Sequence, residues 1–571
     1  MRTLINAFNG GVISQDAQSR TDLESYSRSC SKLHNFIPHS VGVAIKRAGF
    51  KYLKTTNITG AHLVDFVVAD NLAYILEFSH NRIRVMLNGD WLTNPDGTTL
   101  EVVTVYSASQ VGDISVAQKA NALYIAHPDV APKRLLRNST TGGWSIFEAS
   151  PTWGTNNNPN WTTSHEYPSL VVFYEDRLWF AATRTQNQKL WASAVGDYED
   201  FKGGANADDS FDREIAGNGL NSITFLIAGR DLMVGTLNEE FLIKSPDGKG
   251  LSNTNISILS QTSYGCSRIK PIIVDKAVLF IPRSADKIRE FRYSFSEDSY
   301  EARDLSVMFP LEDDYIINMV YQKDPNPIIW IVTAKGALLG LTYDPIQKVN
   351  AWHTHDVGGL VKDIVVIPDT TTKKDALYIS VLRNTSVCIE VLKTKSVFDS
   401  TDYTYLDSYA TYSFVNDTRV ITGLQRFEGK LVTAVYDNGT GLRIDKQRVN
   451  GSQITLANAT KRLTLGLTYS CELTTVDIEL GNQGTAFLGR KIKIASVNFK
   501  ISKGSGAFLY GMHNKLRSAT KLGVEIDGYT GDLPMMNDVS EDTKIEIKLS
   551  TVYPFKVSLM SVVYKVTEGG L

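Results

Sequence analysis

The sequence predicts a mainly β protein built around a β-propeller of six to eight blades. Apolar residues come in runs of four to eight, rich in Val, Ile, Tyr and Phe and separated by Asn, Asp and Gly clusters, which is typical of short antiparallel strands. Similar strand pairs recur at a long, nearly constant interval, as in propeller blades. Helical periodicity is almost absent.

Residues 1–60 are expected to form an extended, partly helical N-terminal segment. Residues 16–35 are the best helix candidate, and Asp16 stands where a capping residue belongs. The apolar residues that recur there at spacings of three to six are Ala17, Leu23, Tyr26, Cys30 and Leu33. A propeller needs no such leader, so this segment is expected to wrap a neighbouring protein.

Residues 61–400 are expected to form the propeller, with clear strands at 61–68, 72–78 and 338–343. Seven apolar pairs, each followed by a turn and a second strand, mark the repeat: Ala73-Tyr74, Leu123-Tyr124, Leu178-Trp179, Leu232-Met233, Val278-Leu279, Ile329-Trp330 and Leu377-Tyr378. Their steps average about 51 residues, and a four-stranded blade takes about 40–55. A tandem of β-sandwiches is the alternative, but sandwich domains would repeat nearer to about 100 residues.

Two stretches cannot be strands and are predicted to be long surface loops, at 151–168 and 202–219, because Asn, Asp, Gly and Pro dominate them. The blade period fades after residue 400. Residues 401–571 are expected to form a smaller all-β domain, with a clear strand at 492–501, and this region could include strands that close the propeller.

Composition narrows the classes of function. Lys and Arg number 59 against 61 Asp and Glu, so tight binding of nucleic acid through its phosphates is not expected. No apolar run approaches the roughly 18–20 residues of a membrane-spanning helix. The single cysteines Cys30, Cys266, Cys388 and Cys471 form no paired motif, so buried, reduced thiols are expected.

No constellation of residues predicts catalysis. His353 and His355 would lie on one face of a strand, but no third ligand accompanies them, so a polar strand end beside Trp352 is preferred to a metal site. Ser29-Cys-Ser-Lys32 matches the Ser-x-x-Lys pattern of acyl-transfer enzymes, but the companion motifs are absent, so the match is attributed to chance. Motifs of nucleotide-binding and zinc enzymes are absent. We expect no catalytic, cofactor-binding or metal-binding residue. Three adjacent carboxylate pairs are interpreted as solvated turn charges: Asp208-Asp209, Glu239-Glu240 and Asp313-Asp314.

The N-terminal stretch is the most distinctive part of the chain. Its elements are, in order, Phe8-Asn9-Gly10-Gly11, Ser14, Arg20-Thr21-Asp22-Leu23, Tyr26, Cys30, Leu33, Asn35-Phe36-Ile37, Gly42 and Lys46-Arg47-Ala48-Gly49-Phe50. This order resembles the opening of the tail nozzle proteins of short-tailed bacteriophages, the tail tubular protein B-like or stabilisation-protein family. The chain departs from the family pattern at Val12, Gln15, Val43 and Ala48. Similar segments continue at 178–201, 263–293, 330–353 and 423–469.

The resemblance implies a structural protein of the podovirus virion, made in the host cytoplasm and assembled as a homohexamer at the distal end of the tail. Such a ring would lie beneath a ring of adaptor proteins, carry tail fibres or spikes, and hold double-stranded DNA until ejection. DNA would pass through without specific binding, which suits a net charge near zero. The resemblance implies no enzymatic activity and no cofactor.

Two other functions stay open at this stage. A virion-associated glycan hydrolase on a propeller scaffold is the main alternative, because paired carboxylates leave no local motif. A propeller scaffold unrelated to phages is the other. Under the nozzle interpretation, at least one of the two long loops is expected to line or cap the channel or to dock fibres.

Overall fold

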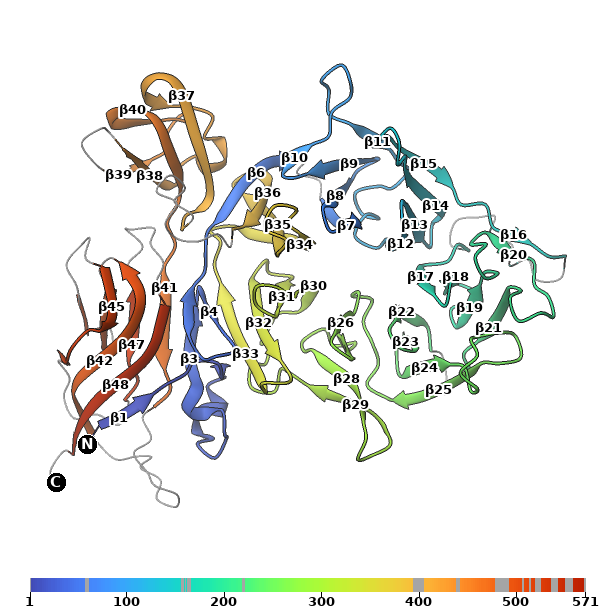
Figure 1. The fold of residues 1–571 in the computed structure, drawn as a ribbon, viewed down its shortest axis with the longest axis horizontal. Coiled ribbons are helices and arrows are strands. Elements are labelled where there is room, and N and C mark those ends of the chain that lie inside the picture. Colours follow the sequence, from blue (N-terminus) through green and yellow to red (C-terminus); the bar gives the residue numbers. More distant parts are fainter. Residues whose placement is uncertain are drawn as a thin grey trace.

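The computed structural model describes residues 2–56, 61–155, 159, 161, 166–217, 221–393, 405–437, 442–477, 492–505, 508–512, 515–518, 525–535, 543–549 and 558–568. Within these ranges, seven antiparallel sheets surround a common centre, and two further groups of strands lie beside them (Figure 1). The predicted mainly β, propeller fold is confirmed. The described residues contain only three short 3-10 turns as helical elements, and none of these could span a membrane.

The first four blades follow one another along the chain, each built as a meander from the centre outward. Their strands are β7 (His62–Ala69), β8 (Leu72–Ser79), β9 (Arg82–Leu87), β10 (Asp90–Trp91) and β11 (Glu101–Val103); β12 (Ser115–Lys119), β13 (Ala122–His127), β14 (Val130–Arg137) and β15 (Trp144–Glu148); β17 (Leu170–Tyr174), β18 (Arg177–Ala181), β19 (Lys189–Ala192) and β21 (Phe211–Glu214); β22 (Ile223–Ala228), β23 (Leu232–Thr236), β24 (Glu240–Lys244) and β25 (Ser257–Thr262). Every predicted apolar pair in this part lies on the second strand of a blade.

The last three blades include the one that closes the ring. Their strands are β26 (Ile272–Val274), β27 (Ala277–Phe280), β28 (Arg289–Ser294) and β29 (Ser299–Asp304); β30 (Ile316–Gln322), β31 (Ile328–Thr333), β32 (Leu338–Asp344) and β33 (Val349–His355); β34 (Leu360–Pro368), β35 (Asp375–Arg383), β36 (Ser386–Leu392) and β6 (Phe50–Thr56). The fourth strand of blade seven therefore comes from the N-terminal segment, with Phe50 opposite Leu392 and Thr56 opposite Val387. The closing strand comes from residues 50–56, not from the region after residue 400.

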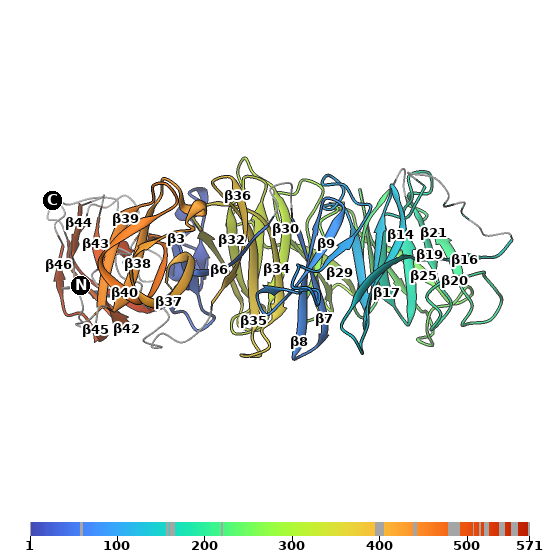
Figure 2. The ribbon, with the colours of Figure 1, turned by 90° about the horizontal axis from the view of Figure 1, so that it is seen from above.

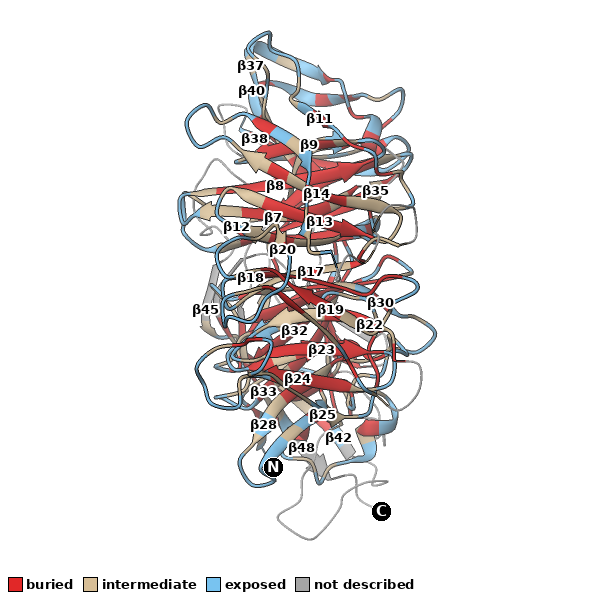
Figure 3. Cartoon of the chain, turned by 90° about the vertical axis from the view of Figure 1, so that its right-hand side faces the viewer, coloured by how far each residue is buried: buried red, intermediate tan, exposed pale blue. Residues whose placement is uncertain are grey.

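Adjacent blades share apolar cores, and the described residues contain one buried cluster at each of the seven interfaces. Blades bury side chains on both faces, which is why their second strands are apolar at successive positions rather than alternating. Figure 3 shows buried segments running through the stacked sheets and exposure concentrated in the turns. Representative members, from the first interface to the last, are Leu135, Phe180, Leu190, Phe280, Ile329, Ile379 and Ile75.

The chain leaves the propeller through a four-stranded sheet that continues blade seven. Its strands, in spatial order, are β37 (Asp407–Ile421), β40 (Ile454–Leu467), β38 (Leu431–Asp437) and β39 (Leu442–Arg448). A separate apolar core fills this sheet and the turn η3 (Gln425–Phe427). We call these residues, 405–467, the arm domain.

The two chain ends build a sandwich together. Its core combines side chains from before residue 50 and after residue 468, such as Phe8, Leu33, Val497 and Val562. The contributing strands are β1 (Arg2–Ile5), β2 (Gly11–Val12), β3 (Ser29–His34), β4 (Phe36–Pro38) and β5 (Ala44–Lys46); β41 (Cys471–Thr475), β42 (Ile492–Ser505), β43 (Phe508–Met512), β44 (Lys515–Ser518), β45 (Glu525–Tyr529), β46 (Leu533–Pro534), β47 (Glu546–Leu549) and β48 (Ser558–Glu568). Figure 2 shows the sandwich and the propeller side by side in one flat slab.

The helix predicted over residues 16–35 is wrong. Two short 3-10 turns, η1 (Asp16–Ser19) and η2 (Tyr26–Arg28), are followed by strand β3. Asp16 caps nothing, because no side chain caps η1. Cys30 and Leu33 are fully buried, but they lie on strand β3, which pairs with β41, and not on one face of a helix. Spacings of three to six are too irregular for one helical stripe, so pairing within the sheet decides the conformation.

Candidate functional site: the buried junction around Arg47

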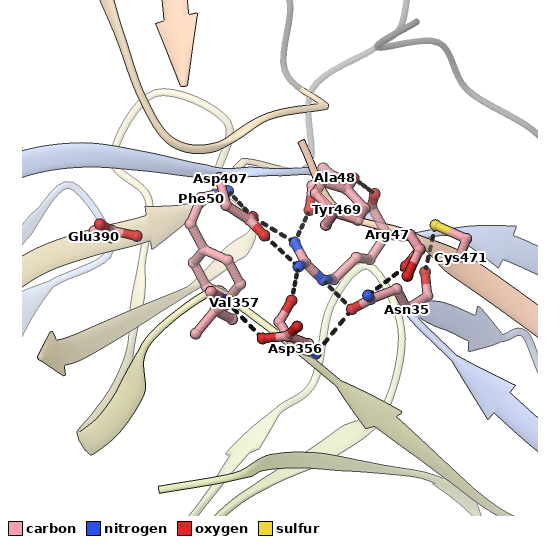
Figure 4. A network of polar contacts seen from close by, with 12 residues as sticks. Asn35, Arg47, Ala48, Phe50, Asp356, Val357, Glu390, Asp407, Tyr469 and Cys471 are labelled. Carbon is pink, nitrogen blue, oxygen red and sulfur yellow. Dashed lines mark hydrogen bonds and ion pairs between the residues drawn. The ribbon is translucent and has the colours of Figure 1, made fainter. Parts of the chain in front are cut away.

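Arg47 lies where the propeller, the arm domain and the sandwich meet (Figure 4). Its side chain is fully buried and forms a bidentate ion pair with Asp407, at 2.7 Å from Nη1 to Oδ1 and 2.6 Å from Nη2 to Oδ2. Nη2 also donates to the carbonyl of Asp356 at 2.6 Å, and Nη1 donates to that of Ala48 at 2.9 Å. Nε donates to Oδ1 of Asn35 at 3.0 Å, so one guanidinium joins four segments of the chain.

Asn35 distributes the same network to the sandwich and the propeller. Its backbone has a left-handed φ of 55°, a conformation that Asn tolerates better than most residues. Its Nδ2 donates to the carbonyl of Ser470 at 2.6 Å, and its Oδ1 accepts from the amide of Asp356 at 3.1 Å. The Asn35 side chain therefore holds the start of strand β41 against the end of blade six.

Aromatic rings cover the cations of the junction. The Tyr469 ring lies 4.0 Å from the Arg47 guanidinium carbon, and its hydroxyl donates to the Arg47 carbonyl at 2.5 Å. The Lys46 ammonium lies 5.2 and 5.3 Å from the ring centroids of Tyr405 and Tyr469. Such cation–π contacts partly replace lost hydration.

Burial sets the electrostatics of this site. Desolvation alone would lower the pKa of Arg47, but the charge and hydrogen bonds of Asp407 outweigh it and raise that pKa. Burial lowers the pKa of Lys46 and raises the pKa of Cys471 to about 11. The hydrogen bonds of Arg47 and Asn35 thus connect the three parts of the chain that meet at this site.

Two glycines of the N-terminal stretch let these bodies approach closely. A Cβ on Gly49 would stand 1.8 Å from the carbonyl oxygen of Leu406. Gly11 has a left-handed φ of +69°, and a Cβ there would stand 2.3 Å from the backbone nitrogen of Trp352. Only glycine fits where β2 passes blade six and where β6 begins.

A second polar cluster, around Asp363, joins the inner strands where the ring closes. Its Oδ2 accepts from the amide of Leu63 at 2.7 Å and contacts His62 Nδ1 at 2.9 Å, and its Oδ1 accepts from Asn318 Nδ2 at 2.6 Å. Burial lowers the pKa of His62, but Asp363 outweighs it and raises that pKa. One carboxylate thus connects blades one, six and seven.

The two histidines predicted to share a strand face do so, as a buried pair inside blade six. His353 Nδ1 lies 2.6 Å from His355 Nε2, so one ring donates to the other. Burial lowers the pKa of His353 to about 3, and burial together with the neighbouring His353 lowers that of His355 well below its usual range. Within the described ranges, no group of three or more His, Cys, Asp or Glu side chains could hold a metal ion.

The adjacent carboxylates do not share one environment. Asp208 and Asp313 are exposed, as expected for turn charges. Glu240 is fully buried, so the prediction of a solvated charge is wrong there. It accepts from Thr262 Oγ1 at 2.5 Å, the Tyr264 amide at 3.2 Å and Cys266 Sγ at 3.3 Å. These donors replace the water that the Glu240 carboxylate loses on burial, so the side chain needs no cation beside it. No pattern in the sequence predicted that Glu240 would be buried.

The predicted loops lie at the outer rim of blade three (Figure 1). The prediction that neither stretch could contain a strand is wrong, because β16 (Thr152–Trp153) pairs with β20 (Asp200–Phe201) and β21 (Phe211–Glu214) pairs with β19 as the fourth strand of the blade. Pairing within the sheet outweighs the composition of these stretches. Residues 156–158, 160, 162–165 and 218–220 of these loops lie outside the described residues. Buried Arg177 shapes the loop at 202–210 by donating to the carbonyls of Ser193, Ala207, Asp208, Asp209 and Leu251.

A shallow polar hollow of about 260 Å³ opens beside this loop, between Thr155, Ser210 and Asn253. Its charged lining residues are already paired, Lys202 with Asp200 at 3.0 Å and Asp212 with Lys189 at 2.9 Å. The hollow therefore has no free charge of its own to recognise an ion.

All four cysteines are buried and free, as predicted.

Comparison with known proteins finds likeness in solved structures alone. No family model matches the sequence, and no curated protein matches it. The β-propeller domain of Cps50 (Swd1) from Myceliophteria thermophila is 8% identical over 60% of this chain and 99% of that one, with a TM-score of 0.38. U3-55K is 10% identical over 60% and 98%, with a TM-score of 0.36. The RRP9 WD40 repeats are 10% identical over 61% and 100%, with a TM-score of 0.37.

Proposed function

We propose that this chain is the distal nozzle subunit of a short bacteriophage tail, a structural component that surrounds the DNA channel, retains DNA until infection and offers docking surfaces. The observation that carries the proposal is the position of the residues behind the sequence resemblance. Gly11, Asn35, Arg47 and Gly49 all belong to the buried junction. The family-like motif is thus also the part of the chain that locks propeller, arm domain and sandwich together.

Rigidity suits this role, because a nozzle acts by shape rather than by turnover. Apolar cores join the seven blades, the polar contacts of Asp363 connect blades where the ring closes, and the contacts of Arg47 tie the ring to the arm domain and the sandwich. The propeller region, residues 61–404, contains 31 Lys and Arg against 42 Asp and Glu. An acidic surface repels DNA phosphates, so a channel lined by it would let DNA slide without binding.

The proposed partners are further copies of the chain in a closed ring, an adaptor ring above it, and fibres or spikes at its side. The rigid loop at 202–210 is a proposed docking site, because Arg177 holds its exposed residues in one conformation. Deleting residues 203–208 should abolish fibre attachment or let packaged DNA leak. Full, infective particles would refute that role.

The proposal is tested by locating the protein in particles. Gold-labelled antibodies against the purified chain should bind the distal end of short tails in electron micrographs, and six copies should form its ring. Labelling of capsids, or of no particle, would overturn the proposal. Incubating the purified chain with cell-wall or capsular glycan should release no reducing ends, whereas release would favour the hydrolase alternative.

A further inference from the structure

The arm domain ends in an exposed patch with basic and apolar side chains. Strands β37 and β40 extend beyond their core, and their register shifts between Ser413 and Thr418, so residues 414–417 bulge from the ladder. The bulge presents Val415, which is 91% exposed. We call Val415 and the exposed Arg419, Lys461 and Arg462 the arm patch, in which these three cations outnumber the one exposed carboxylate of the bulge, Asp417.

A patch of opposite character lies on blade five, at the turn between β28 and β29. Phe295 at its tip is 92% exposed, and Glu297 and Asp298 beside it are exposed as well. The Tyr293 hydroxyl donates to Asp298 Oδ1 at 2.5 Å, which helps to fix the turn. We call Phe295, Glu297 and Asp298 the tip patch.

The net charges of the two regions that carry the patches have the same signs as the patches themselves. The propeller region is acidic, with the 31 basic and 42 acidic residues given above, whereas the remaining residues contain 28 Lys and Arg against 19 Asp and Glu. The two patches lie on opposite sides of the molecule in Figure 1. One molecule therefore cannot join its own patches, but two copies can.

We propose that the arm patch of one copy docks on the tip patch of a second copy. Phe295 would pack against the bulge at Val415, and Lys461 and Arg462 would face Glu297 and Asp298. An apolar anchor with a charged rim is the usual anatomy of a specific interface. Two different patches on one chain make a head-to-tail contact, which closes into a ring when the rotation allows. This inference rests on the proposed ring and names its contact.

Charge reversal tests the contact on the full-length chain. We expect the wild-type chain, concentrated at low salt, to form closed oligomers in light scattering after size exclusion. Glu297→Lys/Asp298→Lys and Lys461→Glu/Arg462→Glu should each reduce association at least about tenfold, because like charges would then face each other. The chain that carries all four changes should associate again. Glu312→Lys/Asp313→Lys is the matched control, since both residues are exposed on another turn, and should associate as wild type does.

The outcomes separate two failures. If the wild-type chain stays monomeric in solution and shows no ring in particles, the proposed nozzle assembly fails together with this contact. If rings form and the two charge-reversal variants assemble normally, the contact between these patches is wrong and the nozzle proposal stands. The same conclusion holds if the chain with all four substitutions does not recover association. Circular dichroism and an unchanged melting temperature must show that each variant is folded.

Discussion

Arg47 and Asp407 lie 360 positions apart in the sequence and form a bidentate, fully buried ion pair. The pair connects the segment before blade one to the first strand after blade seven, and Asp407 also accepts from the amide of Phe50 at 3.2 Å, where the closing strand begins. Loss of one partner would leave a buried charge, which is far more harmful than loss of both.

Asp407→Asn should lower the free energy of unfolding by about 3–5 kcal/mol, because it leaves the Arg47 guanidinium buried without its counter-charge. The double variant Arg47→Met/Asp407→Leu should lose less than Asp407→Asn does. Urea unfolding followed by fluorescence measures both. Asp22→Asn removes the exposed pair with Arg20 and serves as the control, which should unfold as wild type does. A larger loss in the double variant would contradict the argument.

Gly49→Ala should prevent the arm domain from docking, because its Cβ would overlap the Leu406 carbonyl. We expect a sharp fall in soluble yield, and faster limited proteolysis of the remaining protein close to Leu406. Gly112→Ala is the matched control, since a Cβ there meets nothing within 4 Å. Equal yields for the two variants would show that the close approach can relax.

Acid should destabilise blade six through the histidine pair. The pKa of His353 in the folded chain, about 3, lies below its unfolded value of about 6.5, so the folded state binds protons more weakly. The stability from this neutral pair is complete above about pH 6.5 and is lost as the pH falls below it, by at most about 1.4 kcal/mol per pH unit for each group.

Melting temperatures from pH 7.5 to pH 5 measure this effect. His353→Gln/His355→Gln should flatten the fall toward acid, even if its melting temperature at pH 7.5 is lower. His80→Gln changes an exposed histidine and should leave the wild-type slope unchanged. A double variant with the wild-type slope would show that other groups cause the acid sensitivity.

Arg177→Leu should loosen the rim of blade three without opening the ring. Removing the guanidinium takes this donor away from the buried carbonyl groups of Ser193 and Leu251 and from the half-buried contacts at residues 207–209. Hydrogen exchange at amides 203–210 should become about tenfold faster or more, whereas amides of β31 should keep their protection. Arg184→Leu, at an exposed ion pair with Asp129, is the control and should change neither region. Unchanged exchange in both variants would show that other contacts shape the loop.

Much of the propeller could be predicted from the sequence because its signal is local and repeated. Leu178 and Trp179, and their six counterparts, mark second strands that must be apolar on both faces. The cysteines were predictable for a similar reason, since an isolated thiol far from any partner is usually buried. The seven blades lie within the predicted six to eight.

Long-range pairing accounts for what the sequence could not reveal. Nothing near Phe50 indicates that β6 completes a sheet with Leu392, and nothing near Cys30 indicates that β41 will pair with β3. The junction was missed for the same reason, although Asn35, Arg47 and Gly49 all stood in the distinctive N-terminal stretch. Glu240 is buried because donors from β25 and the following turn surround it, and no short-range pattern encodes them.

Closure by β6 also has a consequence for synthesis on the ribosome. Strand β6 is made first, and its partner β36 follows more than 300 residues later. At about 5–20 residues per second, the nascent strand waits on the order of 20–70 s with neither edge paired, because its other neighbour, β37, is made later still. The ring therefore cannot close during translation. Until β36 is made, each new chain is an incomplete ring whose unpaired strand edges can pair with neighbouring chains on the same polysome.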